Sequence, residues 1–454
     1  MPTDDGVKLV HWQRAAYGFG DFGFNLYWTT VSFFILYFYT DVLGLSGTVA
    51  GLIFLVAMLW DAITDPLMGY YAQRTRSRWG SYRPYFLFGA VPLGASLILT
   101  FHNPNLEGSA LIAYVLLTHM LFRTAYTAVN IPYSALSAKI THSTEERNSL
   151  SAWRISFATI GSAFVAYSTL KLVELFGQGD AALGFTLTVA CYAALSLPVF
   201  GILFFTVQEP DHDRLSGRPA NLQRNLLDLL KNKPFMVVAA ATVLATLGSV
   251  LASKTLVYYF KYVIGDDTAV GTAFAINSLV ILMAAPFWAL VTARMSKRFV
   301  WRAGALISIA SSLLLFVNTS ETVPVVVAIA GFSAFGAAAA HLTFWSALPD
   351  TVEYGELQNG RRDESLVFGV MGFIQKASYG VAAALAGFLL DQIGYQANAV
   401  QSQSTLEALK IVMTLIPAGF ILAAFFVIGN YRLDRVTHGR ILRVLQKREL
   451  RERD

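Results

Sequence analysis

The feature that most constrains this chain is a series of apolar stretches, each close to the length needed to cross a lipid bilayer. About 20 helical residues cover the roughly 30 Å of hydrocarbon in a membrane. Hydrophobic residues make up 55% of the chain and charged residues only 14%, well below the proportion in soluble domains. The sequence therefore predicts an all-α membrane protein. Twelve transmembrane helices are predicted, at residues 17–43, 48–72, 84–102, 109–137, 152–175, 182–207, 234–264, 270–293, 301–318, 323–348, 364–390 and 406–430.

Several other classes of protein are excluded by composition and motif. The first 14 residues are polar and no cleavage site follows, so we expect the first span to be kept rather than removed as a signal peptide. Cys191 is the only cysteine, which rules out disulfides within the chain and a cysteine metal site. The sequence has no nucleophile motif and no long polar domain. We therefore expect no enzymatic activity, no cofactor and no nucleic-acid partner, despite the net charge of +5.

The basic residues predict the orientation of the chain in the membrane. If both ends are cytoplasmic, 27 of the 34 Lys and Arg residues fall in the tails and cytoplasmic loops. Only Lys171, Lys261 and Lys410 then lie on the far side, and four basic residues lie within spans. An excess of Lys and Arg marks cytoplasmic loops. We predict a multi-pass protein of the cell inner (plasma) membrane with both termini in the cytoplasm.

A weak internal repeat predicts two related halves. Shifting the second half by 220 residues places Pro286 on Pro66 and Arg294 on Arg74, so that a span and the basic loop after it recur. A polar stretch at 208–233 separates the halves. Transporters built from repeats bind substrate where the halves meet. We predict a six-helix bundle at 1–207, a cytoplasmic linker at 208–233, a second six-helix bundle at 234–430 and a basic cytoplasmic tail at 431–454.

Two carboxylates lie within the second predicted span, where acids are least favourable. Asp61 and Asp65 are four residues apart and so share one face of a helix. Pro66 frees backbone groups nearby, and the Thr64 hydroxyl adds an oxygen. The corresponding positions of the second half are apolar, so packing alone does not require the acids. Oxygen ligands suit Na⁺ or a shared proton, and acids within a membrane are usually functional. The alternative is a structural ion pair with a buried Arg or Lys.

Four motifs together resemble a known transporter family. They are WDAITDPLMG, TRSRWGSYRPY, DTVEYGE and FIQKASYG. The resemblance extends from Tyr17 to about Tyr395. They are similar to the glycoside, pentoside and hexuronide cation symporters of the major facilitator superfamily, whose best known member is the melibiose permease. This resemblance implies two pseudo-symmetric six-helix bundles. It also implies sugar uptake driven by a gradient of Na⁺, Li⁺ or H⁺, with no other cofactor.

The resemblance also implies roles for individual residues. The cation would bind Asp61 and Asp65, with Thr64 and Thr127 beside them. In a sodium-coupled protein, the two acids would be the metal ligands. The positions that match substrate contacts, or lie beside them, are Asn25, Tyr126, Asn130, Arg154, Trp345 and Lys376.

Two departures from the melibiose permease bear on the substrate. Asn25 and Asn130 stand where that protein has acids that hold sugar hydroxyls. Basic residues within the spans, which include Arg123 and Lys254, then outnumber the available acids. An anionic sugar such as a uronide would supply the missing charge, because arginine matches carboxylates well. The alternative is that Arg123 and Lys254 bond backbone carbonyls or extend toward water.

Two charged cytoplasmic loops are predicted to act as a gate. Arg76 and Arg78 lie in the loop after the second span, and Asp350 and Glu353 lie in the stretch DTVEYGELQNGRRDES. Ion pairs between them would close the cytoplasmic side of the carrier. The alternative is that both loops serve only to orient the chain in the membrane.

Three classes of function fit the sequence to different degrees. A cation-coupled symporter of a sugar or glycoside is favoured, working as a monomer in the lipid bilayer with a small-molecule sugar and a coupling cation as partners. A cation-coupled carrier of a lysolipid-like amphiphile is the nearest alternative, since animal lysolipid carriers share a WDAITDP-like stretch. A membrane sensor or enzyme fits least.

Overall fold

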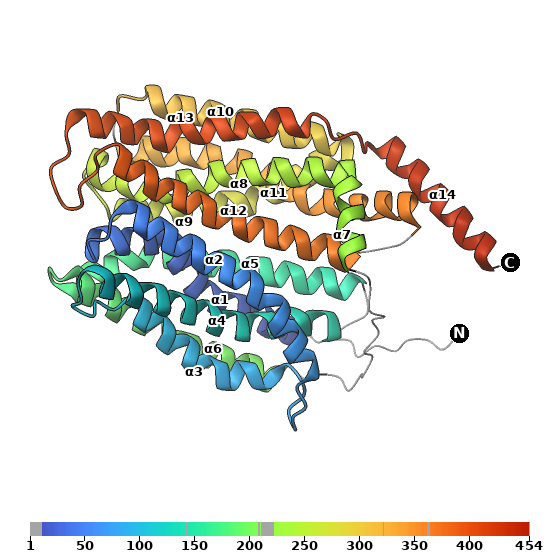
Figure 1. The fold of residues 1–454 in the computed structure, drawn as a ribbon, viewed down its shortest axis with the longest axis horizontal. Coiled ribbons are helices and arrows are strands. Elements are labelled where there is room, and N and C mark those ends of the chain that lie inside the picture. Colours follow the sequence, from blue (N-terminus) through green and yellow to red (C-terminus); the bar gives the residue numbers. More distant parts are fainter. Residues whose placement is uncertain are drawn as a thin grey trace. The chain divides into compact units, whose positions relative to one another are not determined.

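The computed structural model describes residues 11–140, 144–207, 209, 222–320, 322–360 and 364–453, and Figure 1 labels its elements. Within these ranges the regular secondary structure is entirely helical. Each of the twelve predicted spans is confirmed as a helix. In chain order they are α1 (His11–Tyr37) with a π-helical end η1 (Phe38–Val42), α2 (Gly47–Arg74), α3 (Arg83–Thr100), α4 (Gly108–Ile140), α5 (Thr144–Gly177), α6 (Ala181–Thr206), α8 (Lys233–Tyr259) with a π-helical end η2 (Phe260–Ile264), α9 (Ala269–Arg294), α10 (Lys297–Val317), α11 (Val323–Asn359), α12 (Glu364–Gln392) and α13 (Gln403–Ile428).

Eleven of these helices are long and apolar enough, by composition, to cross a membrane. The remaining predicted span, 17–43, falls on α1, which is long enough but is not among the helices that are apolar enough to cross a membrane. Arg14, Asp21 and Asn25 lie within it, together with several glycines. Much of α1 is nevertheless buried within the protein. A helix surrounded by other helices can carry such polar residues, because it does not face lipid.

Helical structure extends beyond the spans on the side predicted to be cytoplasmic. The stretch 350–359, expected as a loop, is instead the end of α11, which continues to Asn359. The helix continues through Gly355 and ends at Gly360, whose left-handed conformation, with a φ of +68°, caps it. The predicted linker contains α7 (Leu222–Lys231), and the predicted tail forms α14 (Arg435–Arg453).

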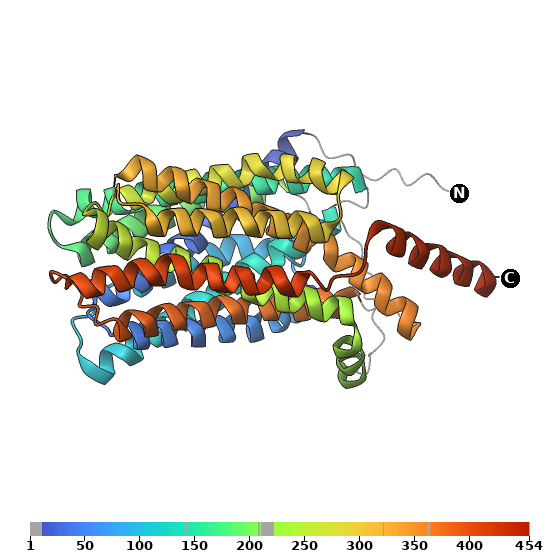
Figure 2. The same ribbon diagram turned by 90° about the horizontal axis from the view of Figure 1, so that it is seen from above.

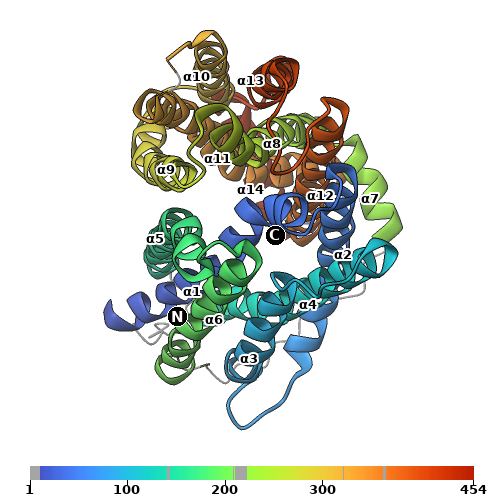
Figure 3. The ribbon, with the colours of Figure 1, turned by 90° about the vertical axis from the view of Figure 1, so that its left-hand side faces the viewer.

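The chain forms two compact units that do not follow chain order. The first contains Met1–Arg214, Leu256–Leu279 and Ala383–Leu406. Within it α1 packs on α5 and α6, while α4 packs on α2 and α3, as the end-on view in Figure 3 shows. This arrangement brings α2 and α4 together, and these helices carry the predicted cation residues.

The second unit contains Leu215–Thr255, Val280–Ala382 and Glu407–Asp454. Within it α10 packs along α11, and the tail helix α14 lies against the end of α11, as Figure 2 shows for the orange and dark red segments. A side chain at Gly336 on α11 would overlap the backbone of Gly304 on α10. This close approach agrees with the small residues of the GAAAA stretch at 336–340, which allow helix backbones to meet.

Small residues also bring segments from opposite halves of the sequence together in the first unit. A side chain at Gly387 would overlap the carbonyl group of Gly47 at the start of α2. The backbone N–H groups of Gly47 and Thr48 both donate to Asp391, at distances of 2.8 Å. A carboxylate at a helix N-terminus satisfies donors that the helix itself leaves unpaired. Asp391 thus fixes the start of the helix that carries the acid pair.

Candidate functional site

The two acids of α2 converge on one hydroxyl of α4. Thr127 Oγ1 lies 2.8 Å from Asp61 Oδ1 and 2.9 Å from Asp65 Oδ1. Asp61 is almost fully buried and Asp65 is half-buried. Thr127 has only one proton to donate, so it cannot fully satisfy both carboxylates. Three oxygen atoms that meet in this way make a site suited to a small hard cation or a shared proton.

Local helix geometry explains why these oxygens meet. Asp61 and Asp65 are one turn apart on α2, and α2 packs along α4. The helix runs unbroken through Pro66, but proline has no N–H, so the Ala62 carbonyl lacks its usual helical donor. This adds an oxygen with spare acceptor capacity beside Asp61. The Thr64 hydroxyl instead donates to the Asp61 carbonyl oxygen on its own helix, at 3.2 Å.

Arg154, a predicted substrate contact, is paired within the first unit. Arg154 Nε lies 2.6 Å from Asp21 Oδ2, and Arg154 Nη2 lies 3.3 Å from Asp21 Oδ1. The Tyr133 hydroxyl also donates to Asp21, at 2.6 Å. Asp21 therefore balances one of the basic residues that the sequence left without a partner. Asn25 lies one turn further along α1 and donates to the Asp21 carbonyl oxygen at 2.8 Å.

An aromatic group lies next to the acid pair. The Tyr126 ring is 5.8 Å from the Phe24 ring and 6.0 Å from those of Trp28 and Phe122. Tyr126 and Asn130 are half-buried and lie on α4, the helix that also carries Thr127. Aromatic faces next to hydrogen-bonding groups are typical of sites that bind small molecules.

Arg123 lies one turn before Thr127 and is fully buried. Its guanidinium carbon is 5.1 Å from the centre of the Trp28 ring and 5.6 Å from that of Phe54. Among the described residues, none of its three side-chain nitrogens has a hydrogen-bond partner. Arg123 therefore shares a face of α4 with the hydroxyl that contacts the acid pair, and its predicted role toward a substrate stays a prediction.

The remaining predicted substrate residues belong to the second unit. Lys254 is 3% exposed, Lys376 is half-buried and Trp345 is 49% exposed. Lys254 and Lys376 both take part in further interactions. Their predicted roles toward a substrate stay predictions.

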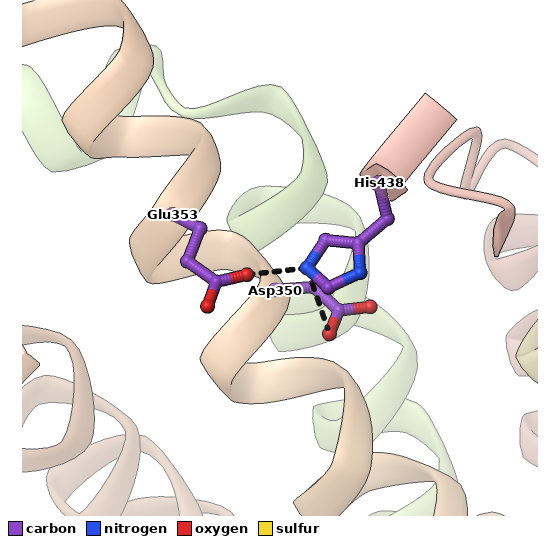
Figure 4. A group of neighbouring side chains, drawn as sticks. All are labelled: Asp350, Glu353 and His438. Atoms are coloured by element: carbon purple, nitrogen blue, oxygen red, sulfur yellow. Dashed lines mark hydrogen bonds and ion pairs between the residues drawn. The ribbon is translucent and has the colours of Figure 1, made fainter. Parts of the chain in front are cut away.

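The predicted gate acids are bound within the second unit. Both Asp350 oxygens accept from Lys297 Nζ, at 2.9 and 2.8 Å, and Tyr431 donates to the same carboxylate at 3.2 Å. His438 on α14 contacts both Glu353 and Asp350, as Figure 4 shows. Burial and the nearby Asp350 charge raise the pKa of Tyr431. The acids thus hold the tail helix against α11.

The cluster of Asp350, Glu353 and His438 also has the spacing of a metal site, because one ligand atom from each residue lies within 4.8 Å of the others. Lys297 already supplies a positive charge to both oxygens of Asp350. A metal ion would have to displace it. An ion-paired contact between helices accounts for this cluster without a metal.

The other gate residues lie at the start of the loop after α2. Arg76 and Arg78 are exposed, and the Arg78 guanidinium carbon lies 4.1 Å from the centre of the Trp79 ring. Their predicted pairing with the acids of α11 stays a prediction.

A second buried acid in the first unit was not predicted from the sequence. Asp41 in η1 accepts from Lys261 Nζ at 2.8 Å, and from the hydroxyls of Tyr262 and Tyr395 at 2.6 Å each. Its backbone carbonyl accepts from Asn398 at 2.7 Å. The internal repeat held the signal, since a shift of 220 residues places Lys261 on Asp41. Both residues lie in π-helical ends, which are often found at functional sites.

Comparisons with known proteins identify the family. The family model described as MFS/sugar transport protein matches residues 16–435. The inner membrane symporter YicJ of Escherichia coli (strain K12) is 30% identical over 426 residues, 92% of this chain and 91% of that protein. The isoprimeverose transporter of Lactiplantibacillus pentosus is 30% identical over 436 residues, 94% of this chain and 90% of that protein. The glucuronide carrier protein homolog of Escherichia coli (strain K12) is 27% identical over 429 residues, which cover 94% of this chain and 93% of that protein.

Solved structures agree with the predicted fold. A bacterial homolog of the human lysosomal transporter Spinster matches with a TM-score of 0.68 at 11% identity, covering 95% of this chain and 97% of that one. The nucleoside transporter NupG matches with a TM-score of 0.65 at 13% identity, covering 93% of this chain and 99% of that one. At these identities the likeness shows the fold alone. With the family match over most of its length, the chain belongs to the glycoside, pentoside and hexuronide cation symporter family of the major facilitator superfamily.

Proposed function

We propose that the protein is a secondary active transporter that couples the entry of a sugar or glycoside to a cation. The observation that carries this proposal is the convergence of Asp61, Thr127 and Asp65 within 2.9 Å contacts in the middle of two apolar helices. Carboxylates in that setting are expensive unless a cation or proton binds them. Relatives named for isoprimeverose and for glucuronide support a sugar as the second substrate.

In this proposal the chain's own residues have distinct tasks. Asp61 and Asp65 hold the coupling ion, Na⁺, Li⁺ or H⁺, with the Thr127 hydroxyl as a third oxygen. The adjoining face of α4, with Tyr126 and Asn130, binds the sugar, so that the two ligands lie on one helix. Because the same helix contacts both ligands, binding of one changes the site of the other.

A charged sugar is the finer part of the proposal. The ion pair between Arg154 and Asp21 removes one of the surplus basic residues in the first unit. Arg123 remains without a hydrogen-bond partner among the described residues. A uronide, whose carboxylate would balance such charge, is therefore proposed as the preferred substrate over its neutral analogue.

The proposed setting of the transporter is the inner (plasma) membrane, with both termini in the cytoplasm. The distribution of basic residues supports this orientation. Both compact units come from one chain, so a monomer in the lipid bilayer suffices for the proposed transport cycle.

Uptake by proteoliposomes tests the proposal. Purified protein would be given radiolabelled methyl β-D-glucuronide, methyl β-D-glucoside and a lysophospholipid, each with and without an inward gradient of Na⁺ or H⁺. We expect at least one glycoside to accumulate only when a cation gradient is present. Accumulation of the lysophospholipid alone would favour the amphiphile carrier, and accumulation that ignores both cation gradients would contradict symport.

A further inference from the structure

Arg123 differs from Arg154 in the same unit because its guanidinium has no hydrogen-bond acceptor among the described residues. The side chain is 0% exposed, and Nε, Nη1 and Nη2 lack hydrogen-bond partners among the described residues. Its surroundings are the rings of Trp28, Phe54 and Phe122, at 5.1 to 5.8 Å from the guanidinium carbon. A guanidinium has five N–H donors, and burying it away from acceptors is costly.

Aromatic rings compensate for this burial only in part. A cation over a ring face gains electrostatic attraction, but the ring provides no oxygen for the N–H groups. Arg154 shows what a satisfied arginine in the same unit looks like, since it binds both oxygens of Asp21. The difference indicates that the Arg123 guanidinium can still accept an anionic partner.

The acid pair is linked to Arg123 through α4. Arg123 and Thr127 are four residues apart and so lie on the same face of α4. Thr127 contacts both carboxylates directly. Both carboxylates are close enough to act electrostatically on the Arg123 guanidinium.

We propose that Arg123 is a tethered counter-cation of the Asp61 and Asp65 pair, which competes with the coupling ion for these carboxylates. This inference rests on the proposed function. Binding of the ion to the pair releases the guanidinium, and loss of the ion lets it bind Asp61. Arg123 thereby sets the affinity of the site for its ion.

The position of Arg123 also gives ion binding a mechanical consequence. The guanidinium lies against Trp28 of α1 and Phe54 of α2, so its movement changes the contacts of both helices with α4. A single fixed positive charge thus links the occupancy of the ion site to the packing of three helices. This is the kind of differential contact that a coupled carrier needs.

Sodium binding by a variant that lacks the charge tests the proposal. In purified protein without substrate, we expect Arg123→Gln to bind Na⁺ about tenfold or more tightly than the unchanged protein, because a like charge beside the site is gone. Arg123→Lys keeps the charge and should bind Na⁺ as weakly as the unchanged protein. Lys171→Gln removes an exposed positive charge elsewhere in the first unit, and it should leave the affinity unchanged. Equal or weaker Na⁺ binding by Arg123→Gln would overturn the proposal.

A second measurement leaves residue 123 intact. Displacement of the guanidinium should change the fluorescence of Trp28 when Na⁺ or H⁺ is titrated. The change is the difference between the signals of the unchanged protein and of Trp28→Phe. If the two proteins give the same signal change over the titration, the guanidinium does not move with ion binding and the proposal is wrong.

The two proposals fail in different ways. If the unchanged protein accumulates no glycoside under any cation gradient, the proposed function fails, whatever Arg123→Gln does to Na⁺ binding. If accumulation is cation-driven but Arg123→Gln gains no affinity for the ion, only the role of Arg123 fails.

Discussion

Two buried acidic groups in the first unit have opposite surroundings. Asp41 has its own lysine, with Lys261 Nζ at 2.8 Å, and two tyrosine hydroxyls at 2.6 Å. Asp61 and Asp65 instead both accept from the Thr127 hydroxyl and take part in further interactions, and the guanidinium of Arg123 makes no hydrogen bond among the described residues. A buried acid with a complete set of donors is a fixed structural contact. Asp61 and Asp65 differ from Asp41 because one hydroxyl contacts both carboxylates, so that a ligand bound at either acid acts on the other.

The contrast extends to what each group holds together. Asp41 connects η1 with η2 and with the segment around Asn398, which come from opposite halves of the sequence. The acid pair connects two neighbouring helices of one half. We expect changes at Asp41 to act on stability and changes at the acid pair to act on coupling.

The predicted orientation gives an all-or-none test, because it places the Asp41 cluster on the outer side of the membrane. In a protein with Cys191→Ser, cysteine would be introduced at Val400, Arg218 or Arg440 and treated with a membrane-impermeant thiol reagent in intact cells. Val400 is fully exposed, and we expect only Val400→Cys to react. Labelling of Arg218→Cys or Arg440→Cys without prior lysis would reverse the orientation.

Removing one acid of the pair should have the largest effect on transport. Asp61→Asn or Asp65→Asn takes away a charge that the coupling ion needs, so cation-driven accumulation should be lost. Exchange of substrate down its own gradient should persist, because most candidate sugar contacts lie on other residues. Uptake and exchange by proteoliposomes separate these two results. A variant that still concentrates substrate with unchanged cation dependence would remove that acid from the ion site.

Asp41→Asn should instead lower stability by about 3 kcal/mol, because it leaves Lys261 without its acid in a largely buried site. Thermal unfolding of purified protein measures the loss. The exposed Glu107→Gln is a matched control and should change the stability by less than about 0.5 kcal/mol. Adding Lys261→Met to Asp41→Asn should recover much of the loss. A double variant no more stable than Asp41→Asn would show that the ion pair is not the cause.

Much of this architecture is predictable from hydropathy, and most pairings are not. Eleven spans follow from apolar length, the first was predicted although α1 is less apolar, and the acid pair follows from its place in a span. The extension of α11 to Asn359 was missed because membrane length predicts only where a helix leaves the bilayer, not where it ends. The pairing of Arg154 with Asp21 depends on how α1 packs against α5, which spacing within one helix cannot reveal.

The smallest expected effect tests the charge of the substrate. Asn130 is half-buried on α4, one turn from Tyr126 and close to Thr127 in sequence. Asn130→Asp would place a negative charge near the proposed sugar site. It should weaken binding of methyl β-D-glucuronide by on the order of 1–3 kcal/mol, roughly tenfold to a hundredfold. Methyl β-D-glucoside should lose little affinity, because a carboxylate still accepts from its hydroxyls.

Affinities of both sugars in the unchanged protein and in Asn130→Asp decide whether the substrate is selected for its charge. If the unchanged protein prefers the glucoside, or the variant weakens both sugars alike, the substrate is not selected for its charge and Arg123 acts on the coupling ion alone.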